Sequence, residues 1–546
     1  MTAEKFQARA IRRRRRFNKN RRMKKIYSNK RPFIVLLILL ALILPLKFSL
    51  TAQMQTNQAT PRFPIKREES PESWRRDGLN AIEQAKKNKI PKGRAKNVIL
   101  FIGDGMGITT LTAARILEGQ LRGESGEENR LSFEQFPFVA LSKTYSANQQ
   151  TPDSAPTMSA IMTGIKTDEG VLSVNQNIVR GDYKTVKGNE TETLLEIAED
   201  AGKSTGVVTT ARLTHATPGA CYAHTADRDW ESDKDIFDRK KDAFNAKFPD
   251  IARQLLEFNH GDGLEVAIGG GRTKFLPGET NDPEYPNVKG ERLDRRNLAI
   301  EWTKKYKNSA YVWNKRQFDT IDAKKTEHLL GLFEPSHMQY NYDRPRDRAG
   351  EPSLSEMTVK AIDVLSNNKN GFFLMVEAGR IDHAHHNGNA FRALTDAVEL
   401  SNAVRAAESK INLDDTLIIV TADHSHTFTM AGYPIRGNNI LGLVREVDDN
   451  GIVEEKDKAD KNGKPFTTLG YGNGRGYRGG ERPVLTEEQV TNPDYKQEAA
   501  VPLGDETHGG EDVGIFANGA SSYLIHGVME ENWIFYAMQE AMRLKK

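Results

Sequence analysis

Histidines and carboxylates gather in two short segments of this sequence, and together they could bind metal ions. Five of the 12 histidines fall within residues 382–386 and 423–426. Asp382 and His386 are four residues apart, which puts them on one face of a helix or in one tight loop. Carboxylate and imidazole without thiolate suit Zn²⁺ at open catalytic sites, and the remaining carboxylates suit Mg²⁺. Any one pair is also typical of a solvated surface, so the predicted metal site depends on the whole set.

One serine is placed as a nucleophile would be. Ser154 lies two residues before Pro156, and proline is common at the first position of a helix. The hydroxyl would then face free N–H groups and the positive end of the helix dipole, where a phosphate or an alkoxide is stabilised. A serine that simply caps the helix, contributing about 1 kcal/mol, fits the same pattern. This segment alone leaves both interpretations open.

Apolar runs alternate with helical patterns along the chain and supply a frame for these residues. Short, largely apolar runs are typical of strands buried on both faces, and helices between them favour a parallel sheet. The expected strands are residues 97–102, 204–209, 264–268, 372–376 and 416–421, and the expected helices are 109–117, 157–163, 191–201 and 390–409. We predict an α/β fold with a mostly parallel central sheet and helices on both faces.

The candidate ligands directly follow these expected strands. Ligands of parallel sheets gather beyond the carboxyl ends of the strands. The polar residues at these ends are Asp104, residues 214–217, Glu377, Asp382, Asp423 and His424. Residues from about 430 to 506 are rich in glycine, asparagine and charge, and we expect them to form an insertion or flap near the active site.

The first 32 residues form a basic arm in front of an apolar segment. Fourteen Lys or Arg against one acid, Glu4, give the arm a charge of +13, so the rest of the chain carries −9 of the total of +4. Residues 33–50 are typical of a transmembrane signal anchor or a signal peptide, with the basic side in the cytoplasm. Residues 51–95 would be a tether with a short helix near 78–87.

The residues after the apolar segment are expected outside the cytoplasm, in the cell envelope. Leu50-Thr51-Ala52 is a poor cleavage site, so retention as a membrane anchor is favoured at least as much as removal, and partial release stays open. A basic arm could instead bind nucleic acid or direct nuclear import. Such arms rarely adjoin an apolar run, so we expect no nucleic-acid partner.

Composition excludes several classes of protein. The chain has 546 residues, of which 38% are hydrophobic, enough for a sizeable core and too many for a disordered protein. Its one cysteine, Cys221, excludes an internal disulfide framework and any cysteine-rich zinc finger.

Together these segments resemble the alkaline phosphatase family, in details closer to its animal type than to its best-known bacterial type. The resemblance covers most of residues 96–546, expected as one catalytic domain. The motifs that carry it are residues 102–107, 153–155, 214–218, 224–229, 376–386, 420–427 and 506–512, with 525–528 and 530–532 near the end of the chain. Several independent motifs in the right order make a chance match improbable.

The resemblance implies three metal ions and hydrolysis of phosphate monoesters at alkaline pH. The implied ligands are Asp382, His386 and His508 for one zinc; Asp104, Asp423 and His424, with Ser154, for the other zinc; and Asp104, Thr217 and Glu377 for magnesium. Ser154 would be the nucleophile that forms a phosphoserine. Arg228 would hold the non-bridging oxygens of the substrate as a planar, two-pronged donor.

Other positions carry the resemblance less directly. Asp153 adjoins the nucleophile, while His215 and His383 stand where the bacterial pattern has Asp and Lys, so magnesium affinity and turnover do not follow from that pattern. Animal relatives also carry a calcium site. The matching residues would be Glu284, Phe333 through its carbonyl, Glu334 and Glu351. A homodimer is expected.

Two other functions stay open on the sequence alone. A relative with the same metal core could act on phosphodiesters or sulfate esters. A catalytically silent, membrane-tethered protein could bind phosphate or metal without turnover. Intact residues at every implied ligand position favour the phosphomonoesterase.

Overall fold

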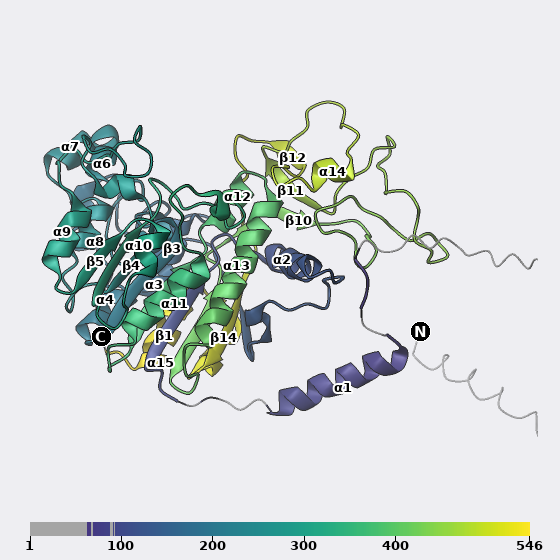
Figure 1. Cartoon of the computed structure of the whole chain (residues 1–546), viewed down its shortest axis with the longest axis horizontal. Coiled ribbons are helices and arrows are strands. Elements are labelled where there is room, and N and C mark those ends of the chain that lie inside the picture. Colours follow the sequence, from purple (N-terminus) through teal and green to yellow (C-terminus); the bar gives the residue numbers. More distant parts are fainter. Residues whose placement is uncertain (1–62, 67–68, 88–90, 92, 546) are drawn as a thin grey trace, which may run out of the picture. The chain divides into compact units, whose positions relative to one another are not determined.

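The computed structural model describes residues 63–66, 69–87, 91 and 93–545 (Figure 1). The predicted basic arm and the predicted anchor segment at 33–50 lie outside the described residues. Among those described, no helix has the length and apolar character needed to span a bilayer. In the expected tether, helix α1 covers Pro71–Lys87 and is longer than predicted. Pro71 starts it, and the two lysines of its last turn suit the negative end of its dipole.

A ten-stranded sheet forms the centre of the fold. Its order is β15-β2-β14-β8-β1-β7-β3-β4-β6-β5. The strands are β1 (Asn97–Ile102), β2 (Phe138–Lys143), β3 (Ser204–Arg212), β4 (Val266–Gly270), β5 (Ser309–Val312), β6 (His328–Leu332), β7 (Phe372–Glu377), β8 (Thr416–Thr421), β14 (Val513–Gly519) and β15 (Gly527–Glu530). Only β14 runs antiparallel to its neighbours in this described sheet. The prediction of a mostly parallel sheet is confirmed, and each expected strand is present.

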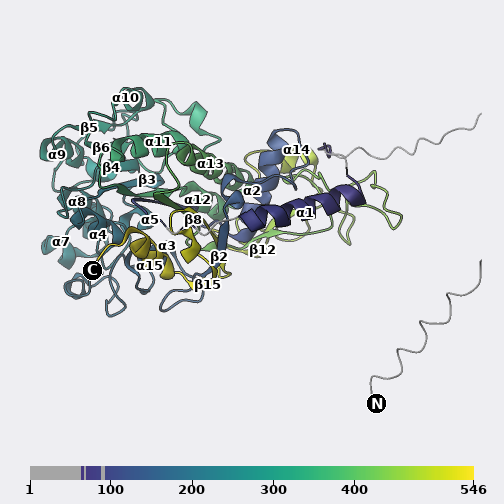
Figure 2. The same cartoon turned by 90° about the horizontal axis from the view of Figure 1, so that it is seen from below.

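Helices cover both faces of this sheet, as predicted (Figure 2). One face carries α2 (Ile108–Leu121), α11 (Leu354–Leu365), α12 (Arg380–His386) and α13 (Ala390–Glu408). The other carries α3 (Ser154–Thr163), α4 (Leu194–Asp200), α5 (Ala216–Gly219), α8 (Ile251–Glu257), α9 (Leu298–Lys305) and α15 (Trp533–Met542). The shorter helices α6 (Asp233–Arg239), α7 (Lys241–Asn245) and α10 (Lys315–Asp319) complete this part of the chain.

Strand β1 shows why a continuous apolar run suits the centre of the sheet. Val98, Leu100 and Ile102 point into the core layer on the α3 side, whereas Ile99 and Phe101 point into the layer on the α13 side. All five are fully buried. Each such side chain contributes roughly 1.5–3 kcal/mol on burial, so both layers anchor the strand whose end carries the candidate ligands.

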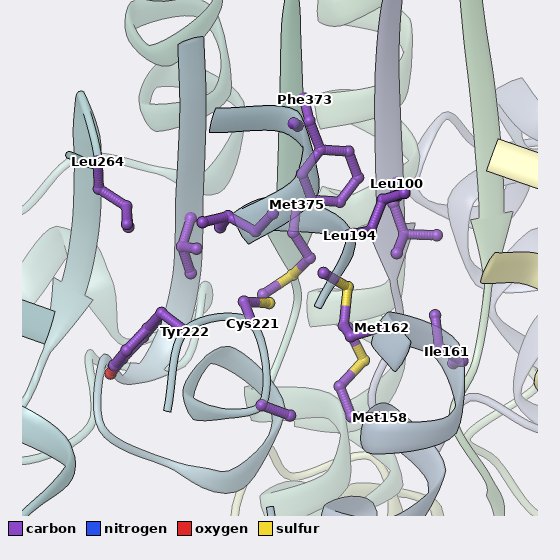
Figure 3. Packing of buried hydrophobic residues seen from close by; sticks show 14 of the residues in the cluster. Leu100, Met158, Ile161, Met162, Leu194, Cys221, Tyr222, Leu264, Phe373 and Met375 are labelled. Carbon is purple, nitrogen blue, oxygen red and sulfur yellow. The ribbon is translucent and has the colours of Figure 1, made fainter. Parts of the chain in front are cut away.

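The core layer on the α3 side packs against the helix that begins at the candidate nucleophile, Ser154. Figure 3 shows Leu100 and Met375 of adjacent strands together with Met158 of α3 and Cys221. Cys221 is a free, buried thiol, and burial raises its pKa. It therefore acts as a small apolar side chain of the core.

The segment expected as an insertion forms a small sheet of its own. Strands β10 (Phe428–Met430), β11 (Leu469–Gly474) and β12 (Ala499–Pro502) form it, with α14 (Glu487–Val490) beside them. On either side of this segment, β9 (Ser425–His426) pairs with β13 (His508–Gly509), and the register places His508 opposite His426. The chain thus returns to the strand ends after a long excursion and brings one more histidine to them.

Candidate metal centre and active site

Three buried carboxylates converge where adjacent strands end. Asp104 follows β1, Glu377 ends β7 and Asp423 follows β8, and β1 lies between the other two strands. All three are fully buried. Both oxygens of Asp104 and one oxygen each of Glu377 and Asp423 lack a hydrogen-bond partner among the described residues. Buried carboxylates without partners are costly, so this cluster fits residues that bind cations.

The first group of ligands surrounds His424. Its Nε2 lies 3.5 Å from Asp104 Oδ1, 3.3 Å from Asp423 Oδ2 and 3.0 Å from Ser154 Oγ. Zinc bonds of about 2.0–2.2 Å place tetrahedral ligand atoms about 3.3–3.6 Å apart. The donor types and spacings therefore fit one zinc ion, with the serine hydroxyl beside it.

A second group lies around Asp382 of α12. Its Oδ1 is 3.2 Å from His386 Nε2 and 3.4 Å from His508 Nε2, and these two nitrogens are 3.1 Å apart. The i,i+4 spacing on α12 places Asp382 and His386 on one face, and the β9–β13 pairing supplies His508. This group also has the donor types and spacing of a zinc site.

The outer nitrogens of these histidines are held by backbone carbonyls. His386 Nδ1 lies 2.6 Å from the carbonyl of Glu506, and His508 Nδ1 lies 2.7 Å from that of Pro152. A carbonyl only accepts, so each Nδ1 carries the proton. Each Nε2 therefore keeps a lone pair for a metal ion.

His426 and Glu506 support the second group, and the sequence did not assign them this role. His426 Nε2 lies 2.8 Å from Asp382 Oδ1, and its Nδ1 lies 2.5 Å from Glu506 Oε2. Burial lowers the pKa of His426, but these two carboxylates outweigh burial and raise it to about 10. The resulting imidazolium fixes the orientation of Asp382. A usable signal was present, since His426 follows His424 by two residues in one of the two histidine-rich segments.

We expect His426→Gln to weaken zinc binding at the second group by about 10- to 100-fold, the usual effect of losing an outer-shell partner. Zinc content after dialysis against a weak chelator would measure the change. His526→Gln, at an exposed histidine, is the matched control and should retain its zinc. Equal zinc retention by both variants would show that His426 does not position Asp382.

The third group lies around Glu377. Asp104, His215 and Glu377 each offer a ligand atom within 4.8 Å of the others. Thr217 Oγ1 is buried and lacks a hydrogen-bond partner among the described residues, while the Thr209 hydroxyl donates to Glu377. The carboxylates of Asp104 and Glu377 suit Mg²⁺, and Asp104 belongs to both this group and the group around His424.

Metal retention by the holoenzyme is expected to fall as the pH decreases from about 7 to 5. Burial, with neighbouring charges, raises the pKa of Glu377 to about 7 and that of Asp423 to about 6. In the metal-free chain these groups hold protons that a cation must displace, so affinity rises with pH. Metal content after dialysis at graded pH tests this, and a pH-independent content would contradict it.

Three neutral imidazoles border the third group. The ring centroids of His215 and His383 are 5.3 Å apart, and His337 lies 4.0 Å from His383 and 5.4 Å from His215. Burial lowers the pKa of all three, that of His383 to about 3. The sequence indicated His215 and His383 but not His337, which the loop after β6 brings in.

Asp153 connects the start of α3 to Arg228. It caps the helix by accepting from the Ala155 N–H at 2.5 Å, and the helix begins at Ser154. The interpretation of Ser154 as the cap is therefore wrong. Arg228 Nη1 donates to Asp153 Oδ1 at 2.6 Å, and its Nη2 lies 3.2 Å from His215 Nε2. Burial works against ionisation of Asp153, but Arg228 outweighs it and lowers the pKa.

The residues matched to a calcium site also form a cluster. Gln339 links Glu334 and Glu351 through its side chain and its backbone N–H, at 3.0 and 2.9 Å. Burial raises the pKa of Glu334 to about 7 and that of Glu351 well above its usual range. Asp347 adds a carboxylate that the sequence missed, and neither of its oxygens has a hydrogen-bond partner in the part of the chain that is described.

Glu284 and the Phe333 carbonyl complete this acidic cluster. Arg272 Nη1 donates to the Phe333 carbonyl at 2.7 Å, and its Nη2 donates to Glu284 at 3.2 Å. Asp347 also helps to raise the pKa of Glu284, after burial. The structure thus brings all four expected residues together, with Arg272 already bound to two of them.

Comparisons with known proteins show which family the chain resembles. The alkaline phosphatase family model matches residues 95–544. The human tissue-nonspecific alkaline phosphatase is 46% identical over 495 residues, covering 89% of this chain and 90% of its own. An alkaline phosphatase of Gadus morhua is 46% identical over 487 residues, covering 88% of this chain and 98% of its own.

Solved structures show the same fold. The alkaline phosphatase of Thermus thermophilus has a TM-score of 0.58 at 23% identity, covering 84% of this chain and 93% of its own. That of the Antarctic bacterium TAB5 has a TM-score of 0.56 at 22% identity, covering 83% of this chain and 100% of its own. With the family model and the relatives, these matches show that the chain belongs to the alkaline phosphatase family of hydrolases.

Proposed function

We propose that this enzyme hydrolyses phosphate monoesters through a phosphoserine at Ser154, with two zinc ions and one magnesium ion, at alkaline pH. The observation that carries this proposal is the position of Ser154 Oγ, 3.0 Å from His424 Nε2 and next to buried carboxylates without partners. A serine that only capped a helix would need no such surroundings.

The three groups of side chains would hold the metal ions. The groups are Asp382, His386 and His508 for one zinc; Asp104, Asp423, His424 and Ser154 for the other; and Asp104, Thr217 and Glu377 for magnesium. When bound, the ions would supply Lewis-acid charge that lowers the pKa of a serine hydroxyl and stabilises a departing alkoxide.

Ser154 and Arg228 would perform the residue chemistry. Ser154 Oγ gives its proton to water and attacks phosphorus; the Oγ–P bond forms, the ester P–O bond breaks, and the departing alkoxide takes a proton from water and leaves as the alcohol. A second water then attacks the phosphoserine, the P–Oγ bond breaks, Ser154 Oγ takes a proton back, and inorganic phosphate leaves. Arg228, held by Asp153, would bind two non-bridging oxygens throughout. The N-terminus of α3 adds the positive end of its dipole beside Ser154.

Comparison of ester types tests this proposal. The holoenzyme should show a far higher kcat/KM on p-nitrophenyl phosphate than on bis-p-nitrophenyl phosphate or p-nitrophenyl sulfate. Preference for the diester or the sulfate would favour the alternative substrates. No turnover of any ester by a chain loaded with metal would favour a silent binding protein.

We further propose a catalytic domain at residues 96–546, with an active-site flap at about 430–506, that forms a homodimer. Light scattering of the purified protein tests the dimer.

We also propose that the acidic cluster holds a calcium ion. Its charges, with Asp347 added, favour a cation with oxygen ligands. Calcium content of the purified enzyme and of a Glu351→Gln variant would test that site.

Most of the activity is expected in the cell envelope and not in the cytosol. The basic arm precedes the apolar segment at 33–50, which orients everything after it to the outside, and the poor cleavage site favours retention as an anchor. Cell fractionation and sequencing of the mature N-terminus test both points. Cytosolic activity would contradict the topology, whereas a wholly soluble exported form would contradict only the anchor.

A further inference from the structure

A basic cavity of about 760 Å³ lies at the edge of the sheet opposite the metal centre. Lys96 directly precedes β1, Lys203 directly precedes β3 and Lys369 lies three residues before β7. These strands are adjacent and parallel, so their amino ends share one edge while Asp104 and Glu377 lie at the other. A strand of six residues at about 3.3 Å each separates the two edges of the sheet, and so the cavity and the metal centre, by about 20 Å. Figure 1 shows the chain end C at this lower edge, away from α12.

The lining of this cavity is strongly cationic. Its charged residues are Arg94, Lys96, Lys203, Lys369, Arg543 and Lys545 against Glu192 and Asp200. None of the six cations forms an ion pair with an acidic side chain in the described part of the chain. Asp200 is engaged elsewhere, since its Oδ2 lies 2.9 Å from His260 Nδ1. The cavity therefore carries positive charge that the protein does not balance, in a chain whose residues after the arm are acidic overall.

Lys203 shows that this charge is built into the fold. Its side chain is only 4% exposed, and its Nζ donates to the carbonyls of Lys96 and Asn370 at 2.8 Å each. Burial, then the charges of Arg94 and Lys96, lower its pKa to about 8. Among the described residues, this buried ammonium group is bound only to neutral carbonyl oxygens, so a bound anion would stabilise its charge.

Helix ends alone do not account for so many cations. Helices α4 and α15 end here, and each offers roughly half a negative charge. Arg543 follows α15 in the left-handed region, at φ 53°, where glycine is the usual residue. An arginine at that position is unfavourable for the backbone, which favours a role for its guanidinium.

We propose that this cavity binds an anion with two or more phosphate groups, either a free oligophosphate or the headgroup of a phosphorylated lipid. Six cations against two acids leave the lining a net charge of +4. One phosphate would balance at most half of this charge, whereas two phosphates would match it. The volume lies within the usual range for ligand cavities, about 300–1,000 Å³. The ligand would be held without hydrolysis because the metal centre is a strand length away.

Calorimetric titration of the full-length holoenzyme with methylene diphosphonate tests this proposal, because the P–C–P bridge is not an ester. The wild type should bind two molecules per chain, one at the metal centre and one in the cavity. The triple variant Lys96→Gln, Lys369→Gln, Lys545→Gln should lose the second molecule or bind it at least tenfold more weakly. Its turnover of p-nitrophenyl phosphate should not change.

A matched variant separates a site from general screening of charge. Lys187→Gln, Lys324→Gln, Lys461→Gln removes three exposed lysines from other parts of the surface and should still bind two molecules. Equal binding by the cavity variant and the wild type, or equal loss in both variants, would overturn the proposal. Inorganic phosphate that bound the cavity as tightly as the diphosphonate would overturn the requirement for several phosphates.

Bilayers distinguish the two sources of the ligand. The full chain is placed in phosphatidylcholine nanodiscs with or without cardiolipin, which carries two phosphates, and titrated again. Loss of the second diphosphonate site only with cardiolipin assigns the cavity to a lipid headgroup. An unchanged second site in both bilayers assigns it to a free oligophosphate.

Discussion

Asp104→Ala is expected to remove more metal and more activity than the loss of any other single ligand. Asp104 is shared between the group around His424 and the group around Glu377, and neither of its oxygens has another hydrogen-bond partner among the described residues. Its loss should therefore deplete one zinc and the magnesium together. Several kcal/mol of charge stabilisation would disappear, which corresponds to a decrease in kcat/KM of about a thousandfold or more.

Metal analysis of the purified variant measures this directly. Asp414→Ala is the control, since this exposed aspartate lies before β8, at the opposite end of the strands, and should leave metal and activity unchanged. Depletion of only one kind of ion in Asp104→Ala would refute the shared role. The variant without metal should also unfold no more easily than the wild type without metal, because an unpartnered buried carboxylate has been removed.

Ser154→Ala is expected to keep both zinc ions and to lose the covalent intermediate. The other ligands of the His424 group remain in place, whereas the nucleophile is gone. Activity should decrease by roughly a thousandfold or more, with slow residual hydrolysis by direct attack of water. Steady-state kinetics together with zinc analysis would separate these effects.

An exposed serine provides the comparison for that variant. Ser366→Ala, at the end of α11, should retain wild-type turnover and zinc. If Ser154→Ala lost its zinc as well, the decrease in activity would report on metal binding and not on the nucleophile. Wild-type activity in Ser154→Ala would contradict the proposed role outright.

The centre of the fold was predictable from sequence because its strands are apolar on both faces. β1 and β8 have the expected bounds, and β3, β4 and β7 differ by a few residues at their ends. Strands β2, β5, β6, β14 and β15 were not predicted. β2 is half exposed, so its residues alternate, and β14 contains two glycines and an asparagine. The sequences of such strands are only weakly apolar, so they are hard to recognise. Their position in the sheet depends on hydrogen bonding to neighbouring strands.

The candidate site was predictable in part. Asp104 and Asp423 lie just after β1 and β8, and Asp382 lies on α12 shortly after β7, so the topology of the sheet indicates their convergence. His508 is 122 residues from His386 in the sequence, so no local pattern connects the two. The sequence assigned His508 to the site only through the family motif, and the β9–β13 pairing shows how it gets there. His337 reaches the site on a loop without a periodic pattern.

Identification of the phosphorylated residue tests the central claim most directly. The full-length holoenzyme is mixed with a phosphate monoester, quenched in acid within one turnover and mapped by peptide mass spectrometry. We predict one phosphoryl group per chain at most, on the peptide with Ser154 and on that serine. Rapid hydrolysis with the phosphoryl group on another residue, or with no covalent intermediate under any quench condition, would contradict the account.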